Sequence, residues 1–357
     1  MNTLEKLLAR LLSVIAFLCV VIQLSGCNDL RYYRQSVNGQ LDIMDRRTSI
    51  KALVEDESMS PPLRQRLQRV TDFRTFAIEQ LALPETGSYT FYADLERDYV
   101  IQNLFAAPEF SVDLHQWCYP VLGCAAYRGF FDTALLAVDA ASFKEKGFDT
   151  YVALIPAYST LGWFDDPVLN TVIEWPEPQL AGLIFHELAH QKLYVKGDTV
   201  FNESFATAVE QAGVELWLAQ RNNPVLIGRY REQRDHRQQV IELIQQTRSR
   251  LKHLYEQTSE PAAMRIAKRK ILDTARGGYR ALREQWQHDP GFDAWFAGEL
   301  NNARLGSVAA YHTYVDAFLS LLVEEQYDFE AFYARAEEIA GLDQDARQAY
   351  LQESPAR

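Results

Sequence analysis

The sequence predicts an α+β fold that is mainly helical in its second half. Two observations lead to this fold class. Residues 88–106 are rich in tyrosine, phenylalanine, valine and isoleucine and alternate in polarity, as half-buried strands do. From Pro178 onward, the apolar residues recur at helical spacing. With 357 residues and 48% hydrophobic side chains, the chain can bury a sizeable core, which argues against disorder.

The first half is expected to contain helices, then strands, then a hairpin. Two prolines after Ser60 favour a helix that begins near Leu63. Cys118 and Cys124 are expected to form a disulfide, because a proline and a glycine between them favour a turn; two free thiols are the alternative. In chain order, the expected elements are helix over 49–82 broken at Pro61-Pro62, strands over 88–106, a disulfide-closed hairpin or loop over 115–131, a helix over 132–143 and a buried or edge strand over 151–156, with Pro156 favouring the edge.

The second half is expected to be helical to its end. A coiled-coil-like seam of apolar residues runs from Val240 to Leu254, and a second apolar stripe runs from Met264 to Leu282. We therefore expect residues 225–287 to form a long antiparallel helical hairpin with a charged, solvated outer face. The other expected helices are Gln179–Val195, Asn202–Arg221 and two more within 303–353.

The N-terminus has the pattern of a secretory signal. Two basic residues precede the apolar run Leu11–Gln23, which is shorter than a comfortable membrane span. The Leu-Ser-Gly-Cys that ends at Cys27 resembles the lipobox of bacterial lipoproteins, which implies cleavage before Cys27 and lipidation of that residue. We expect a signal peptide over 1–26 and a lipidated tether over 27–48 that leads into helix, with an uncleaved anchor or ordinary secretion as alternatives. By the same resemblance, Asn28 favours the periplasmic face of the outer membrane over the inner membrane.

The net charge excludes one class of partner. The formal charge of the chain is −12. Such a surface would repel the phosphates of nucleic acid, so no nucleic-acid partner is expected.

The segment His-Glu-Leu-Ala-His at 186–190 indicates the chemistry of the chain. His186 and His190 lie one turn apart on one face of the expected helix, so both imidazoles can reach one Zn²⁺. Glu187 follows the first ligand and is placed to act as general base on a zinc-activated water. Two histidines and a glutamate buried at this spacing without a metal would be costly. We therefore expect one zinc ion and a hydrolytic reaction.

A catalytic zinc usually has three protein ligands and one open position. Glu203 follows His190 after twelve intervening residues and opens the next expected helix, which can reverse and pack across the first. We expect Glu203 to be the third ligand and to face the metal from the first turn of that helix. The alternative is an ordinary carboxylate at a helix N-terminus. Glu210, two turns further along the same face, is expected to orient a histidine ligand.

These motifs resemble a known class of enzyme. His-Glu-Leu-Ala-His-Gln followed by Asn-Glu-Ser-Phe-Ala-Thr is similar to the gluzincin zinc peptidases, most closely to the alanyl-aminopeptidase type. The whole mature chain further resembles the putative aminopeptidase family of Gram-negative lipoproteins, including residues 156–170 and Asn301-Asn-Ala-Arg-Leu305. The resemblance implies a gluzincin-like zinc peptidase domain over 49–357, the gluzincin ligand set and a peptide substrate.

Two departures from the classical aminopeptidases bear on the cleavage mode. The spacer of twelve residues is shorter than theirs, and the Gly-Ala-Met-Glu-Asn strand that anchors a free amino terminus is absent. We expect an aminopeptidase, with an endopeptidase of envelope proteins as the alternative. A lipoprotein that binds peptides or an envelope partner without catalysis is the second alternative. Glu187 argues against it, because a closed structural zinc site has no use for this carboxylate.

The resemblance also implies roles for residues on either side of the motifs. Gluzincins keep a substrate-binding edge strand just upstream of the active-site helix, and a Tyr or His from downstream stabilises the oxyanion. For the oxyanion we expect Tyr311, with His312 and Tyr314 as alternatives and a buried core role as another. The segment expected to pair with an extended peptide comprises Tyr158, Ser159, Thr160, Leu161 and Gly162, and its alternative is a structural loop packed by Trp163 and Phe164. Asp165 and Asp166 are candidates for binding a free amino terminus.

Overall fold

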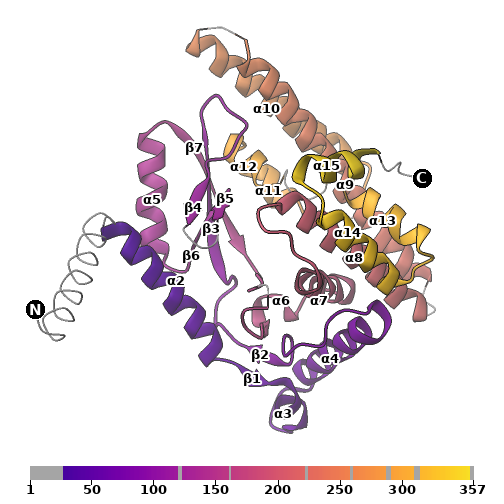
Figure 1. Cartoon of the computed structure of the whole chain (residues 1–357). Helices are drawn as coiled ribbons and strands as arrows, with labels where there is room; N and C mark the ends of the chain where they lie inside the picture. The colour runs from indigo at the N-terminus through magenta and orange to yellow at the C-terminus, as the bar shows by residue number, and fades with distance from the viewer. Residues whose placement is uncertain are drawn as a thin grey trace, which may run out of the picture.

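The computed structural model confirms a mainly helical α+β fold (Figure 1). It describes residues 27–119, 123–160, 162–221, 224–257, 260–286, 291–308 and 314–353. The strands are β1 (Thr48–Ser49), β2 (Phe91–Ala93), β3 (Ile101–Pro108), β4 (Trp117–Tyr119), β5 (Gly123–Ala125), β6 (Arg128–Phe130), β7 (Phe148–Ile155) and β8 (Val168–Leu169). The helices are α2 (Cys27–Asp45), α3 (Ile50–Glu55), α4 (Pro61–Leu81), α5 (Thr133–Glu145), α6 (Asn170–Ile173), α7 (Glu177–Lys192), α8 (Thr199–Gln220), α9 (Pro224–Tyr255), α10 (Pro261–Arg283), α11 (Asp293–Ala297), α12 (Asn302–Gly306), α13 (Val315–Glu324), α14 (Phe329–Ala340) and α15 (Gln344–Glu353).

The strands of the first half form small sheets. The longest pairing joins β3 and β7, antiparallel from Ile101 opposite Ile155 to Pro108 opposite Phe148. The strand order β6-β3-β7 leaves β7 at the edge, as Pro156 predicted. Helix α5 covers one face of this sheet, and the short helix α12 covers the other. Asp132 caps α5 by accepting hydrogen bonds from the backbone of its first turn, which confirms the predicted helix start.

Strands β4 and β5 pair as a hairpin that a disulfide closes. Cys118 lies directly opposite Cys124 in the antiparallel register, and the two sulfurs are bonded. The predicted disulfide is therefore confirmed. A second three-stranded sheet, in the order β1-β2-β8, ties residues 48–49 to the segment that leads into α6 and α7.

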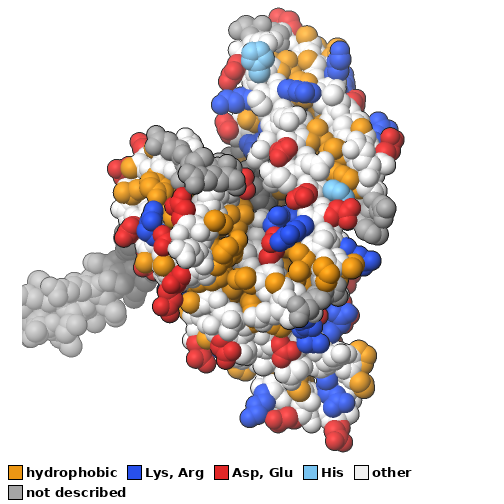
Figure 2. Space-filling view, turned by 90° about the vertical axis from the view of Figure 1, so that its right-hand side faces the viewer, with side chains coloured by type: hydrophobic (Ala, Val, Ile, Leu, Met, Phe, Trp, Pro, Cys, Tyr) orange, Lys and Arg blue, Asp and Glu red, His pale blue; other side chains and the backbone are white. Residues whose placement is uncertain are grey.

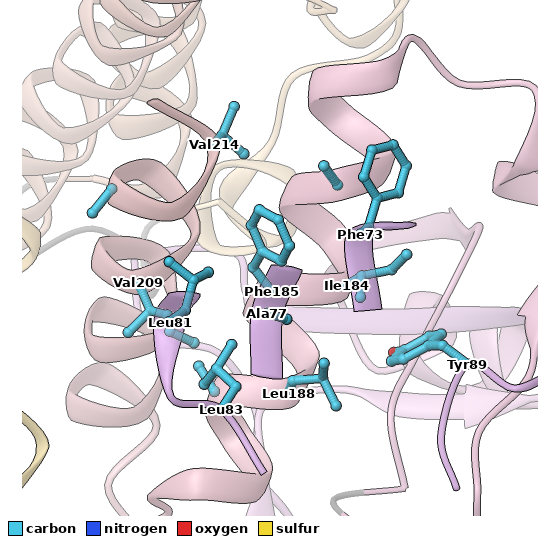
Figure 3. Close-up of a cluster of buried hydrophobic side chains, with 14 of the residues drawn as sticks. Phe73, Ala77, Leu81, Leu83, Tyr89, Ile184, Phe185, Leu188, Val209 and Val214 are labelled. Carbon is cyan, nitrogen blue, oxygen red and sulfur yellow. The ribbon is translucent and has the colours of Figure 1, made fainter. Parts of the chain in front are cut away.

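The main core lies where α7 and α8 pack against α4, α13 and α14. Figure 3 shows Phe73 of α4 beside Ile184 of α7, and Leu81 of α4 beside Val209 of α8. Gly213 of α8 allows the close approach, because a Cβ at this position would lie 2.8 Å from the Phe185 ring and 2.6 Å from Leu81. Burial of these aromatic and aliphatic side chains fixes how α8 crosses α7, and so fixes which residues of the two helices face each other.

Helices α9 and α10 occupy the region in which the long hairpin was expected. They lie side by side, with Leu243 packed on Gly278, and their buried seam includes Val240 and Ile244 from α9. One buried cation fastens the hairpin to the sheet. Lys268 Nζ donates to Asp149 Oδ2 of β7 at 2.6 Å and to the carbonyl oxygen of Glu109 at 2.8 Å.

Two segments differ from the expectation. Of residues 27–48, expected to be a tether that leads into helix, residues 27–45 form α2, because one face of that helix packs on the sheet. The region 303–353 contains α13, α14, α15 and part of α12, where two helices were expected. A turn at Gln326 and Tyr327, both with positive φ, separates α13 from α14. Among the described residues, no helix has both the length and the apolar character that a membrane crossing requires.

Candidate metal centre

The His-Glu-Leu-Ala-His segment lies in the second half of α7, a helix that the core holds on most sides. Leu180, Ile184 and Phe185 are fully or almost fully buried, so α7 cannot rotate without breaking the core. His186 and His190 project from the remaining face. The side chain of His190 is 5% exposed and that of His186 is 17% exposed, so the site is partly open to solvent.

The start of α8 is fixed by side chains on both sides of it. Asp198 caps the helix, accepting a hydrogen bond from the backbone N–H of Phe201 at 3.0 Å. Asn202 binds the preceding loop through both ends of its amide, accepting from Val195 N at 2.7 Å and donating to Val195 O at 2.8 Å. Because the cap is Asp198, α8 begins at Thr199, and Glu203 lies in its second turn. The expectation of a helix start at Asn202, with Glu203 in the first turn, was wrong.

The crossing of the two helices brings three donor groups together. Nε2 of His186 and Nε2 of His190 are 3.1 Å apart. Glu203 Oε2 lies 3.4 Å from His186 Nε2, and Glu203 Oε1 lies 3.7 Å from His190 Nε2. One ligand atom from each of the three residues lies within 4.8 Å of the other two. His186, His190 and Glu203 could therefore hold a metal ion.

These donors fit zinc. In a tetrahedral site with Zn–N bonds of 2.0–2.1 Å, two nitrogens are roughly 3.3 Å apart, close to the separation of the two Nε2 atoms. The set of two imidazoles and one carboxylate is also one that catalytic zinc uses. Burial tends to lower the pKa of His186, yet hydrogen bonds to the Glu203 and Glu210 carboxylates raise it well above its usual value. The pocket thus stabilises positive charge at this point.

Glu210 orients His186 through the ring nitrogen that does not face the other two donors. Its Oε2 lies 3.1 Å from His186 Nδ1, on the side of the ring away from His190. A carboxylate there requires Nδ1 to carry the proton, which leaves the lone pair of neutral His186 on Nε2, facing the other donors. Gly182, one turn before His186, leaves room for this arrangement, because a Cβ at Gly182 would lie 3.1 Å from Glu210 Oε1.

A comparison with models of protein families matches residues 31–351 to the family described as "Putative aminopeptidase". The chain belongs to this family. No curated protein and no solved structure matched the chain. The description of the family indicates a peptidase, and the matched region includes every described residue of the metal centre.

Burial shifts the pKa values of His190 and Glu187 in this member of the family. Burial, and then the neighbouring His186, lowers the pKa of His190 to about 4, so this imidazole is neutral at neutral pH, as a metal ligand must be. Burial also raises the pKa of Glu187 to about 7, against the lowering effect of His186 and of a hydrogen bond with Ser159. Glu187 is not one of the three converging ligands, so its carboxylate remains available for proton transfer.

The segment upstream of α7 is a loop rather than the expected extended strand. Thr160 donates through its backbone N–H to Asp166 Oδ2 at 2.8 Å and through its hydroxyl to Asp166 Oδ1 at 2.9 Å. Ser159 donates to the same carboxylate at 3.2 Å. Asp166 is 5% exposed, so its carboxylate closes this loop and is not presented to a free amino terminus. Strand β7 ends at Ile155, before the segment expected to pair with a peptide.

The loop still contacts the site, through one residue of the expected set. Ser159 hydrogen bonds to Glu187, whereas Tyr158 turns away to hydrogen bond with Gln40. Gly162 packs against Gln191 of the motif helix, and Leu161 lies outside the described residues. Trp163 and Phe164 are 76% and 49% exposed, so they do not pack the loop as its structural alternative required.

Two tyrosines beside the centre were not predicted. Tyr127 precedes β6. The pKa of its phenol is raised first by the loss of surrounding water and then by the negative charge of Glu203, with a smaller contribution from Glu187. The ring centroid of Tyr194 lies 6.3 Å from that of His190. Tyr194 could have been found from the sequence, because it lies four residues after His190. No local pattern indicated Tyr127. The expected Tyr311 and its alternative His312 lie outside the described residues, and Tyr314 is buried in the main core.

Replacing the carboxylate behind His186 is expected to weaken metal binding. Glu210→Ala removes the acceptor that fixes the His186 tautomer, and such partners typically contribute about 10–100-fold to metal affinity. Zinc affinity is measured by competition with a chelator of known strength. Glu215→Ala is the matched control, because Glu215 lies on the same helix but pairs with Arg231 and Arg234. Equal zinc affinity in the two variants would contradict the role of Glu210.

Proposed function

We propose that this chain is a zinc-dependent peptidase with the gluzincin ligand set. The observation that carries the proposal is the convergence of His186, His190 and Glu203 beside an unliganded Glu187. His186 and His190 would hold the ion through Nε2, and Glu203 through its carboxylate. When bound, zinc would lower the pKa of a water molecule to about 7 and polarise the carbonyl of the scissile peptide bond.

The residues of the chain have separate tasks in this reaction. Glu187 accepts a proton from the attacking water on its carboxylate and then gives that proton to the leaving amine. The Ser159 hydroxyl contacts both Asp166 and Glu187, and it would hold the Glu187 side chain by turning its one proton from Asp166 to Glu187. Glu210 keeps the proton of His186 on Nδ1. We assign the hydrogen bond to the developing oxyanion to the phenol of Tyr127 or Tyr194, with Tyr311 retained as the third candidate.

We propose cleavage at the amino terminus of peptides, in keeping with the description of the family. One observation favours the alternative of endopeptidase cleavage. Asp166, a candidate for binding a free amino terminus, is buried and engaged by Ser159 and Thr160. The two modes differ in whether a blocked amino terminus prevents cleavage, so substrates with and without an acetyl cap separate them.

We also propose that the protein acts in the periplasm, attached through lipid on Cys27 to the inner face of the outer membrane. The Leu-Ser-Gly-Cys sequence, the apolar run before it and Asn28 after it support this location. Residues 1–26 lie outside the described part of the chain, so the support comes from sequence alone.

The test combines metal analysis with hydrolysis of free and acetylated peptides by the purified protein. We expect one zinc ion per chain, loss of hydrolysis on chelation and recovery on adding zinc. His190→Ala should bind no zinc and cleave nothing. Cleavage of free but not acetylated peptides would establish an aminopeptidase, and cleavage of both an endopeptidase. A chain that binds no zinc, or that binds zinc without cleaving any peptide, would favour the non-catalytic binding protein.

A further inference from the structure

Helix α2 uses one face to dock on the body of the protein. Gln35 accepts hydrogen bonds from the backbone N–H groups of Phe131 and Asp132, at 2.6 and 3.2 Å. Gly39 lies so close to the Phe131 ring that a Cβ there would overlap it, and Ile43 is 3% exposed in the main core. These contacts fix the rotation of α2, and therefore fix which side chains it directs outward.

The outward face carries a continuous apolar stripe. Leu30, Tyr33, Val37 and Leu41 are 61%, 46%, 57% and 52% exposed. Their spacing of three, four and four residues places them on one side of the helix, over a length of about 16 Å. Single exposed apolar residues are ordinary, but four in one row indicate a surface that is covered by a lipid bilayer or by another molecule. Figure 1 shows α2 at the outer edge of the molecule.

The position of the stripe in the chain indicates what covers it. Helix α2 begins at Cys27, which follows the apolar run Leu11–Gln23. With Cys27 lipidated, or with the apolar run kept as an uncleaved anchor, residue 27 would be held at the bilayer surface. Leu30 is about 4.5 Å further along the helix axis, so the stripe starts at the depth of the lipid headgroups.

The polar residues beside the stripe suit the same surface. Arg31 and Arg34 are exposed on the first two turns of α2, nearest to Cys27. Cationic side chains next to a row of apolar ones are typical of helices that lie in the membrane interface. Residues 27–34 contain two arginines and one aspartate, Asp29, in a chain whose net charge is −12, so this end of α2 is suited to contact lipid phosphates.

We propose that α2 lies flat on the membrane, with Leu30, Tyr33, Val37 and Leu41 inserted among the lipid headgroups. The lipid on Cys27 would then be one of two attachments, and the docked face of α2 would hold the catalytic body in one orientation to the bilayer. This inference rests on the proposed membrane attachment of residue 27 and is independent of peptidase activity.

The experiment uses the full chain in lipid vesicles with a bimane fluorophore on a single introduced cysteine. One variant carries the probe at Val37→Cys on the stripe, and the matched control carries it at Val138→Cys on α5. Both valines are 57% exposed, so the two probes start from equal accessibility. Labelled parent protein gives the background from other cysteines. Each sample is quenched separately by iodide in the water and by nitroxide-labelled lipid in the bilayer.

We expect the Val37 probe to be quenched several-fold more strongly by nitroxide lipid than the Val138 probe, and several-fold less by iodide. Equal iodide quenching of the two probes would overturn the proposal, because α2 would then face water. A Val37 probe shielded from both quenchers would also overturn it, in favour of a second copy covering the stripe. Flotation of the same vesicles reports whether the chain is attached at all, and zinc content and hydrolysis are measured separately.

Discussion

Glu187→Gln is expected to abolish peptide hydrolysis while leaving zinc bound. Glutamine keeps the size of the side chain but cannot accept a proton, and a positioned general base contributes about 10²–10⁴-fold to rate. Glu187 is not among the three converging ligands, so zinc stoichiometry should stay at the value of the parent protein. The measurement is kcat on an unblocked peptide, with zinc determined on the same sample.

The control for this variant is Glu177→Gln, at the first turn of the same helix. Glu177 pairs with Arg221 and Trp217, far from the site along α7, so this change should leave kcat unaltered. If Glu187→Gln kept parental activity with zinc bound, Glu187 would not be the base. If the Glu187→Gln variant lost zinc along with activity, Glu187 would contribute to metal binding as well as to proton transfer.

The largest expected loss of stability comes from breaking a buried ion pair that lies outside the three metal ligands. Arg347 Nε donates to Asp198 Oδ2 at 2.9 Å, and both side chains are 7% exposed. Arg347 also donates to the carbonyl oxygens of Ala340 and Leu342. Arg347→Ala would leave the Asp198 carboxylate buried without its cation, which should lower the free energy of unfolding by about 3–5 kcal/mol. Chemical unfolding followed by circular dichroism measures this difference.

The same change should reach the metal centre, because Asp198 caps the helix that carries Glu203. We expect weaker zinc binding by Arg347→Ala together with its lower stability. Arg335→Ala is the matched control, since Arg335 pairs with Glu325 at the surface and its side chain is 39% exposed. Such exposed pairs contribute about 0–1 kcal/mol. An Arg347→Ala protein as stable as Arg335→Ala would show that the buried pair does not hold α8 in place.

The outer surface of the molecule gives few indications of where this chemistry lies. Figure 2 shows charged side chains of both signs scattered over one face, with hydrophobic side chains gathered in a band along the hollow between two lobes. A cavity of about 430 Å³ lies between α4 and the start of α7, lined by Arg66, Arg69 and Trp175 among others. The candidate site is defined by its converging donors.

The sequence by itself determined what depends on neighbours along the chain. His186 and His190 share a face because a helix repeats every 3.6 residues, and no distant contact is needed for that. Ser60 before two prolines started α4, Asp132 capped α5, and the short interval between Cys118 and Cys124 allowed their bond. Each of these features rests on backbone geometry within a few residues.

Only the tertiary structure decided the features that join distant segments. Glu203 faces the histidines because Gly213 and the surrounding core set how α8 crosses α7. Asp166 is buried against Ser159 and is not open to a substrate, and Tyr127 lies near Glu203 although it comes from the turn before β6. These placements follow from side-chain packing between elements, and the free energy of such packing depends on partners that no local sequence pattern identifies.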